Sequence, residues 1–161
     1  MTALPLELGD LIQLQQLNAN HNLLTTLPSS IGKLTQLQHL HLHNNRFTSL
    51  PSTIGRLSSL LSLFVQENSL KDLPSEICQL TSLLNLFIHK NKIESLPASI
   101  GQLTKMWWFN ISFNLLSSLP SSLGRLSKSL TDFIYSNVCF LLFFFLFFSY
   151  FLLQFFIYLI N

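Results

Sequence analysis

The stretch LPSSIGKLTQLQHLHLHNNRFTS, residues 27–49, contains the pattern that decides the fold. Its opening Leu-Pro pair returns every 23 residues along the chain, without a slip. The pairs stand at residues 4–5, 27–28, 50–51, 73–74, 96–97 and 119–120. An unbroken period of this length is typical of a solenoid of stacked repeats. Because one short unit cannot bury its own apolar face, neighbouring units must share a continuous core.

The apolar residues inside each unit indicate where a strand lies. Leu37, Leu40 and Leu42 form the motif LxxLxL, and its alternation predicts a short strand that starts near the second leucine. The proline lacks an N–H donor, which suits an irregular return segment and would harm a central strand. We therefore predict a curved α/β solenoid with about five parallel strands on its concave face and an irregular or 3-10 convex side.

An asparagine recurs in every unit where the chain turns out of the strand. Its side-chain amide can satisfy backbone groups that the turn leaves unpaired. The sequence thus predicts a structural ladder, which consists of Asn22, Asn45, Asn68, Asn91 and Asn114.

The combined pattern, LPxxIGxLxxLxxLxLxxNxLxx, resembles the 23-residue leucine-rich repeat of the intracellular Ras-suppressor-like and plant Ras-group type. The resemblance covers residues 4 to about 130. It implies a scaffold or recognition module, in intracellular signal transduction, that binds a protein partner it does not identify. The alternatives are a membrane-anchored repeat protein and a repeat fragment of a larger receptor or enzyme.

Three departures from the pattern are informative. Cys78 replaces the glycine of Ile-Gly in its unit, and we expect a small buried residue there rather than a reactive thiol. The sixth unit has one extra residue between Leu126 and Leu130, and the repeat then dissolves. Met1 stands three residues before the first Leu-Pro pair, without a polar capping unit. Since terminal repeats normally carry caps, we expect an incomplete version of a longer array.

Three histidines at alternate positions, His39, His41 and His43, should leave the concave face together. They raise the question of a zinc site. Their neighbours one repeat away include no carboxylate or thiolate, which disfavours a closed metal site and favours recognition. We predict no bound metal and no cofactor.

Aromatic residues share this face with the histidines. Exposed rings within a polar rim are typical of protein-binding surfaces, although rings can also merely cover a sheet. The predicted binding residues are His39, His41, His43, Phe64, Phe87, Trp108 and Asn110.

Composition excludes several other functions. Nine lysines and arginines nearly balance seven acidic residues, which argues against a nucleic-acid partner. The sequence has no GxSxG, phosphate loop, HExxH or paired-carboxylate pattern, so we expect no enzymatic activity. The two cysteines are far apart in sequence, which favours a reducing compartment.

Every lysine, arginine, aspartate and glutamate lies at or before Asp132, so we divide the chain into a repeat domain, 1–132, and a hydrophobic tail, 133–161. Residues 138–160 would span about 34 Å as a helix, close to the thickness of a bilayer core. With Arg125 and Lys128 before it, such an anchor would leave the repeats in the cytoplasm. The alternative is translation of a pyrimidine-rich noncoding stretch, because the tail is rich in phenylalanine and leucine.

Overall fold

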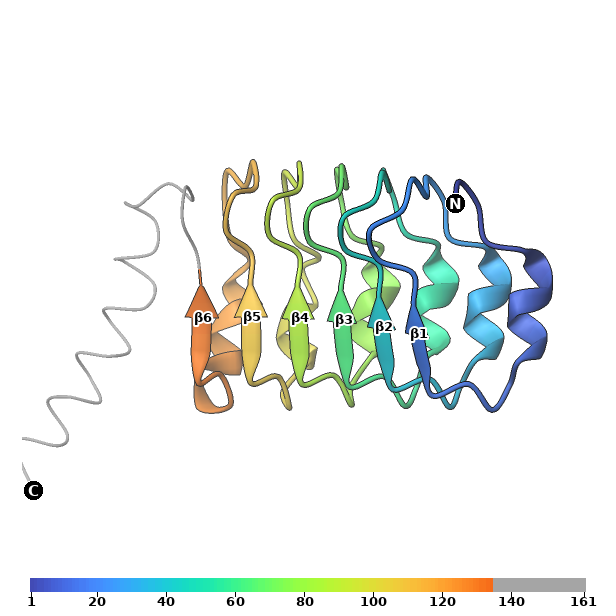
Figure 1. The fold of residues 1–161 in the computed structure, drawn as a ribbon. Helices are drawn as coiled ribbons and strands as arrows, with labels where there is room; N and C mark the ends of the chain where they lie inside the picture. Colours follow the sequence, from blue (N-terminus) through green and yellow to red (C-terminus); the bar gives the residue numbers. More distant parts are fainter. Residues whose placement is uncertain (135–161) are drawn as a thin grey trace, which may run out of the picture.

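The computed structural model describes residues 1–134, in which every repeat adds one strand and one 3-10 helix to the stack. Figure 1 shows the strands in a single layer, with the helices behind them on the other side. The sheet has six strands, which pair in parallel and in chain order. The described chain is thus the predicted α/β solenoid.

Each strand has three residues, and in β1 to β5 the central side chain packs on the core. The strands are β1 Gln16–Asn18, β2 His39–His41, β3 Ser62–Phe64, β4 Asn85–Phe87, β5 Trp108–Asn110 and β6 Asp132–Ile134.

The helices begin directly after the proline of each Leu-Pro pair, with the exception of η5. Proline fixes an extended entry and needs no hydrogen-bond partner for its nitrogen. The helices are η1 Leu6–Asp10, η2 Ser29–Lys33, η3 Ser52–Arg56, η4 Ser75–Gln79, η5 Ile100–Gln102 and η6 Ser121–Lys128.

The sixth strand corrects the predicted number of five. From β1 to β5, residues that face each other across neighbouring strands are 23 positions apart, as His39 and Ser62 are. Between β5 and β6 the offset is one residue larger, because Trp108 faces Asp132. Helix η6 has eight residues and absorbs the insertion. The sheet therefore continues through the degenerate unit, and β6 runs two residues past the expected domain boundary at 132.

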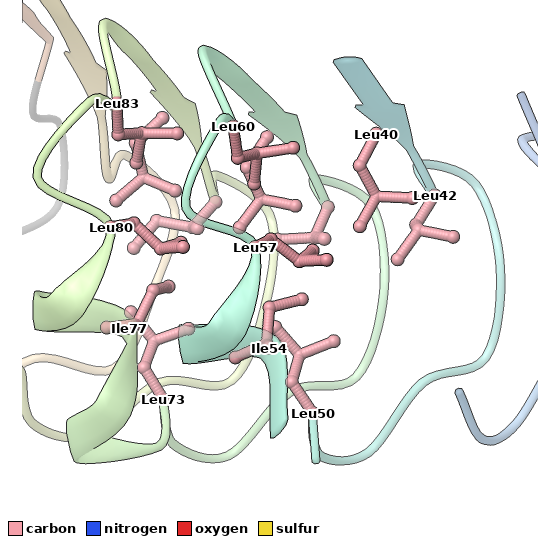
Figure 2. Close-up of a cluster of buried hydrophobic side chains, with 14 of the residues drawn as sticks. Leu40, Leu42, Leu50, Ile54, Leu57, Leu60, Leu73, Ile77, Leu80 and Leu83 are labelled. Carbon is pink, nitrogen blue, oxygen red and sulfur yellow. The ribbon is translucent and has the colours of Figure 1, made fainter. Parts of the chain in front are cut away.

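Stacked rows of leucine and isoleucine fill the space between the sheet and the helices (Figure 2). Leu40, Leu63 and Leu86 occupy one such row and have no exposed surface. Ile54 and Ile77 close the core from the helical side in the same way. The repeats share this core, so each strand owes its stability to its neighbours.

Close packing of the helices explains the recurring glycine. A Cβ atom on Gly55 would lie 2.5 Å from the carbonyl oxygen of Glu76 in the next repeat. At the equivalent position Cys78 does carry a Cβ, and the following helix, η5, is the shortest in the described chain. We attribute the shortening to the space that Cys78 takes. Cys78 itself is buried, and burial raises the pKa of its thiol, which disfavours the reactive thiolate.

The chain leaves five of the strands through a residue in the left-handed conformation. These residues are His21, Asn44, Glu67, Lys90 and Phe113, with φ between 51° and 56°. Asparagine tolerates this conformation, whereas a bulky residue is strained in it.

Phe113→Asn is therefore expected to stabilise the protein by about 0.5–1 kcal/mol, because it relieves strain at an exposed side chain. Thermal melting followed by circular dichroism measures the change. The reverse exchange at the equivalent position, Asn44→Phe, should lower the melting temperature. A lower melting temperature for Phe113→Asn would contradict the strain argument.

None of the helices in residues 1–134 has the length and apolar character needed to cross a bilayer. The predicted anchor, residues 138–160, lies outside the described residues, and so does most of the predicted tail, 133–161. Membrane attachment through it stays a prediction.

Candidate functional site

The outward residues of the sheet form what we call the concave face. They flank the buried central residue of each strand, and a second outward row follows where the strands end. The first set contains Gln16, Asn18, His39, His41, Ser62, Phe64, Asn85, Phe87, Trp108 and Asn110, and the second contains Asn20, His43, Gln66, His89 and Ser112.

Four side chains from successive strands stack into what we call the ring ladder: His41, Phe64, Phe87 and Trp108. The ring centroids of His41 and Phe64 are 4.6 Å apart, and the two planes differ by 13°. Phe64 and Phe87 follow at 5.0 Å and 17°, and Trp108 lies 5.4 Å from Phe87 with a tilt of 54°. The first two spacings follow from the register, because parallel neighbours in a sheet are about 4.8 Å apart. Trp108 instead pairs with Asn85 and reaches Phe87 diagonally. The 23-residue period therefore accounts for the stacking of His41, Phe64 and Phe87.

Stacking changes how much of each ring remains accessible. Phe64 and Phe87 are half-buried, whereas Trp108 keeps 43% of its surface exposed. The faces of Phe64 are covered by His41 and Phe87, so its edge is what the solvent meets. The period predicts that Phe64 and Phe87 can pack together, but it does not predict that His41 stacks on the other face of Phe64.

The imidazoles gather beside one end of the ladder. His43 lies 6.3 Å from His41 and 5.2 Å from His21, in both cases edge to face. Burial lowers the pKa of His41, and neighbouring His39 adds to the effect. Burial also lowers the pKa of His43, with further contributions from His21 and His41 that Glu67 partly opposes. These imidazoles are therefore held in their neutral form at neutral pH.

The row at the strand ends is polar and only partly satisfied. Asn20 Nδ2 lies 2.9 Å from His43 Nε2 and hydrogen-bonds to it. Three other buried atoms of this row, His43 Nδ1, Gln66 Oε1 and His89 Nδ1, have no hydrogen-bond partner in the described residues. Burial lowers the pKa of His89 as well, and Lys90 adds to the shift.

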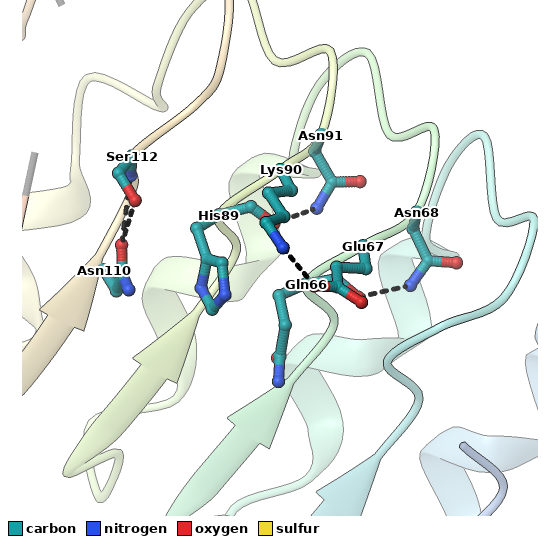
Figure 3. A network of polar contacts seen from close by, with 8 residues as sticks. All are labelled: Gln66, Glu67, Asn68, His89, Lys90, Asn91, Asn110 and Ser112. Atoms are coloured by element: carbon teal, nitrogen blue, oxygen red, sulfur yellow. Dashed lines mark hydrogen bonds and ion pairs between the residues drawn. The ribbon is translucent and has the colours of Figure 1, made fainter. Parts of the chain in front are cut away.

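Permanent charge is confined to the rim of the concave face. Lys90 Nζ lies 2.6 Å from Glu67 Oε1 in the next row beyond the strand ends (Figure 3). This hydrogen bond to Lys90 lowers the pKa of Glu67, so the carboxylate is ionised and paired. The concave face itself contains no lysine, arginine, aspartate or glutamate.

Asn110, one of the predicted binding residues, is occupied within the fold. Its Oδ1 accepts hydrogen bonds from the Ser112 hydroxyl at 2.8 Å and from the Ser112 amide at 3.1 Å (Figure 3). Only 9% of its surface is exposed, so it offers a partner less area than the sequence suggested. The other predicted residues, from His39 to Trp108, do lie together on the sheet.

From the second repeat to the fifth, the asparagines of the asparagine ladder make the same set of hydrogen bonds. Asn91 is representative: its Oδ1 accepts the Leu70 amide at 2.9 Å, and its Nδ2 donates to the carbonyls of Val65 and Ile88 at 3.0 Å. At the first repeat, the amino group of Met1 donates to Asn22 Oδ1 in place of a backbone amide. These side chains hold neighbouring repeats together and are not available to a partner.

A metal site is not assembled in this part of the molecule. Among residues 1–134, no group of three or more histidine, cysteine, aspartate or glutamate side chains has the geometry to hold a metal ion. A role of the aligned histidines in recognition stays a prediction.

Comparison with protein families identifies the class. A model for two copies of the leucine-rich repeat matches residues 12–54, and a second leucine-rich repeat model matches residues 35–93. The chain belongs to the leucine-rich repeat family. The more specific Ras-suppressor-like subtype stays a prediction. The comparison with curated proteins gave no match.

Solved structures share the solenoid. A leucine-rich repeat protein of Leptospira interrogans has 33% identity and a TM-score of 0.66, and the match covers 85% of this chain and 41% of that chain. An internalin of Listeria monocytogenes has 26% identity and a TM-score of 0.74, over 83% and 37% of the two chains. The plant peptide hormone receptor RGFR1, solved in complex with RGF2, has 26% identity and a TM-score of 0.70, over 85% and 27%. The chain thus spans less than half the length of each of these relatives.

Proposed function

We propose that the protein is a recognition module that binds a protein or peptide partner on its concave face, and that it acts by binding rather than by catalysis. The ring ladder is the observation that carries this proposal. Aromatic side chains surrounded by polar groups provide much of the energy of protein interfaces. A structural neighbour, the plant peptide hormone receptor, was solved with a bound partner, which supports the same use here.

A role in intracellular signalling and a cytoplasmic location remain part of the proposal. The resemblance to the Ras-suppressor-like repeats and the charge pattern before residue 133 support them. The likeness to receptor and internalin solenoids favours recognition in general and does not single out this setting.

The concave variant Phe64→Asn/Phe87→Asn/Trp108→Gln is expected to lose most partner binding. Each new residue already occupies the same position in another repeat, as Asn18 does for Phe64, so the sheet can accommodate it. Interface anchors commonly contribute about 2 kcal/mol or more each. Capture from cell lysate with the wild-type protein, followed by quantitative mass spectrometry, identifies proteins whose recovery the variant reduces.

The matched control changes the convex side, where Arg56→Gln introduces the residue that the next repeat has at Gln79. It should capture the same proteins as the wild type. All three proteins must melt at similar temperatures, because the half-buried rings also pack on the sheet. Equal capture by the concave variant and the wild type would reject the concave face as the binding surface.

A further inference from the structure

The chemistry of the concave face restricts what can bind there. The outward positions of β1 to β5 and the row at their ends carry no permanent charge of either sign. The groups on this face that can become charged near neutral pH are imidazoles, and His41 and His43 lie together at one end of the ring ladder. On acidification this end of the face therefore becomes positive. The aspartate of the neighbouring strand, Asp132 of β6, pairs beside Trp108 at the other end.

The orientation of the rings also restricts which chemical groups of a partner can bind. Phe64 is stacked on both sides, so a partner meets ring edges rather than ring faces. The edge of an aromatic ring carries partial positive charge and the face carries partial negative charge. Lysine and arginine side chains bind ring faces, and both faces of Phe64 are covered. Carboxylates, carbonyl oxygens and the faces of other aromatic rings are complementary to the edges.

We propose that the partner is an acidic peptide, in which a carboxylate contacts the imidazole of His41 while an adjacent aromatic side chain packs on the edges of Phe64 and Phe87. This inference rests on the concave-face recognition proposed above and adds the chemical class of the partner. Glu67 at the rim does not take the place of the peptide's carboxylate, because its own carboxylate is paired with Lys90 at 2.6 Å.

Binding of such a peptide depends on pH. The pKa values of His41 and His43 are lowered in the free protein, chiefly by burial. A carboxylate bound at His41 favours its protonated imidazole and raises its pKa. Affinity therefore increases as the pH falls through this raised pKa and levels off below the pKa of His41 in the free protein.

The other groups near these imidazoles do not change the direction of this effect. Neighbouring strands β1 and β3 bring no titratable side chain beside His41. Within β2, His39 lies beside it. At the strand ends, His21 and Glu67 act on His43 with opposite sign.

The test uses the full chain in a mild non-ionic detergent and three short fluorescein-labelled peptides. In these peptides tyrosine alternates with glutamate, with glutamine or with lysine. Fluorescence anisotropy measures binding at about pH 7.5 and about pH 5.5, a range in which imidazole titrates and glutamate stays ionised. The glutamate peptide is expected to bind about tenfold more tightly at the lower pH, because hydrogen bonds to charged groups are roughly twice as strong as neutral ones. The glutamine peptide should show no such change, and the lysine peptide should bind weakly at both.

Two variants test whether the histidines cause the pH dependence of peptide binding. His41→Asn/His43→Gln introduces residues that the chain uses at the same positions in Asn18 and Gln66, and it should abolish the increase at low pH. The control Gln16→Asn copies Asn85, an equivalent position without an imidazole, and should behave like the wild type. Circular dichroism at both pH values confirms that all variants are folded.

The outcomes separate this inference from the proposal on which it rests. If the glutamine or lysine peptide binds as tightly as the glutamate peptide, and Phe64→Asn/Phe87→Asn abolishes that binding, the concave face is a recognition site but its partner is not acidic. If the glutamate peptide binds the phenylalanine variant as well as it binds the wild type, the concave face is the wrong surface. Persistence of the pH effect in the histidine variant, or no binding of the glutamate peptide at either pH, overturns the acidic partner.

Discussion

Asn91→Ala is expected to lower the free energy of unfolding by about 3–5 kcal/mol, because it leaves several buried backbone groups without partners. The Leu70 amide loses its acceptor, and the carbonyls of Val65 and Ile88 lose a donor. Each such group costs about 1–3 kcal/mol when water cannot reach it. Urea denaturation followed by circular dichroism measures the loss.

The matched control is Asn22→Ala at the open end of the same ladder. Its amide donates to the Ala19 and Asn20 carbonyls, and its oxygen accepts from the amino group of Met1. Water can reach these groups, so the expected loss is about 1 kcal/mol. Equal losses at the two positions would mean that the burial of an asparagine in this series does not determine how much it contributes to the free energy of unfolding.

Gly55→Ala should destabilise the protein by about 1–3 kcal/mol, although alanine is the better helix former. The added methyl group would lie 2.5 Å from the Glu76 carbonyl oxygen and 2.8 Å from the Glu76 Cβ, so helix η4 would have to shift. Thermal melting of the two proteins provides the comparison. Because the backbone of Gly55 does not have a positive φ, the cost is steric and not conformational.

Gly124→Ala is the control for this prediction. Within residues 1–134, no atom beyond its chain neighbours and its own helix backbone lies within 4 Å of a Cβ at Gly124, so the exchange should be neutral or slightly stabilising. Cys78→Gly should allow η5 to regain its first turn. If Gly55→Ala and Gly124→Ala had the same effect, the close approach of neighbouring helices would not explain the glycine.

The 23-residue period was enough to predict the architecture of residues 4–130. The alternation around Leu40 located β2 within one residue, and the same arithmetic placed the residues that face one another across the sheet. The prediction works because each repeat contacts only its neighbours, so local pattern and global fold carry the same information.

The sixth strand shows where the pattern stopped being sufficient. The extra residue after Leu126 breaks the sequence period, which suggested that the sheet ends with β5. In the structure, the longer helix η6 takes up that residue and the backbone pairing resumes with β6. The backbone of β6 pairs with β5 although the side-chain pattern has changed. The side-chain pattern alone therefore does not show where the sheet ends.

The candidate site was predicted in position but not in detail. Adding 23 to a residue number places Phe87 beside Phe64, yet it says nothing of the 17° angle between the rings. Side-chain angles depend on neighbours on all sides, and these neighbours come from different repeats. The hydrogen bonds from Ser112 to Asn110 lie within one repeat, and the 23-residue pattern does not reveal them either.

The constant offset between paired strands makes the ladder of rings modular. Residues 50–72 constitute one complete unit, and His41 and Phe87 both stack directly on Phe64, which lies within it. Loss of that unit as a whole would bring His41 into register with Phe87 and shorten the ladder by one ring, without exposing a new kind of contact. Gain of a unit would lengthen it by the same step. The proposed recognition surface can therefore change its length in evolution in whole repeats, whereas a single inserted residue in a strand would turn its side chains to the wrong face.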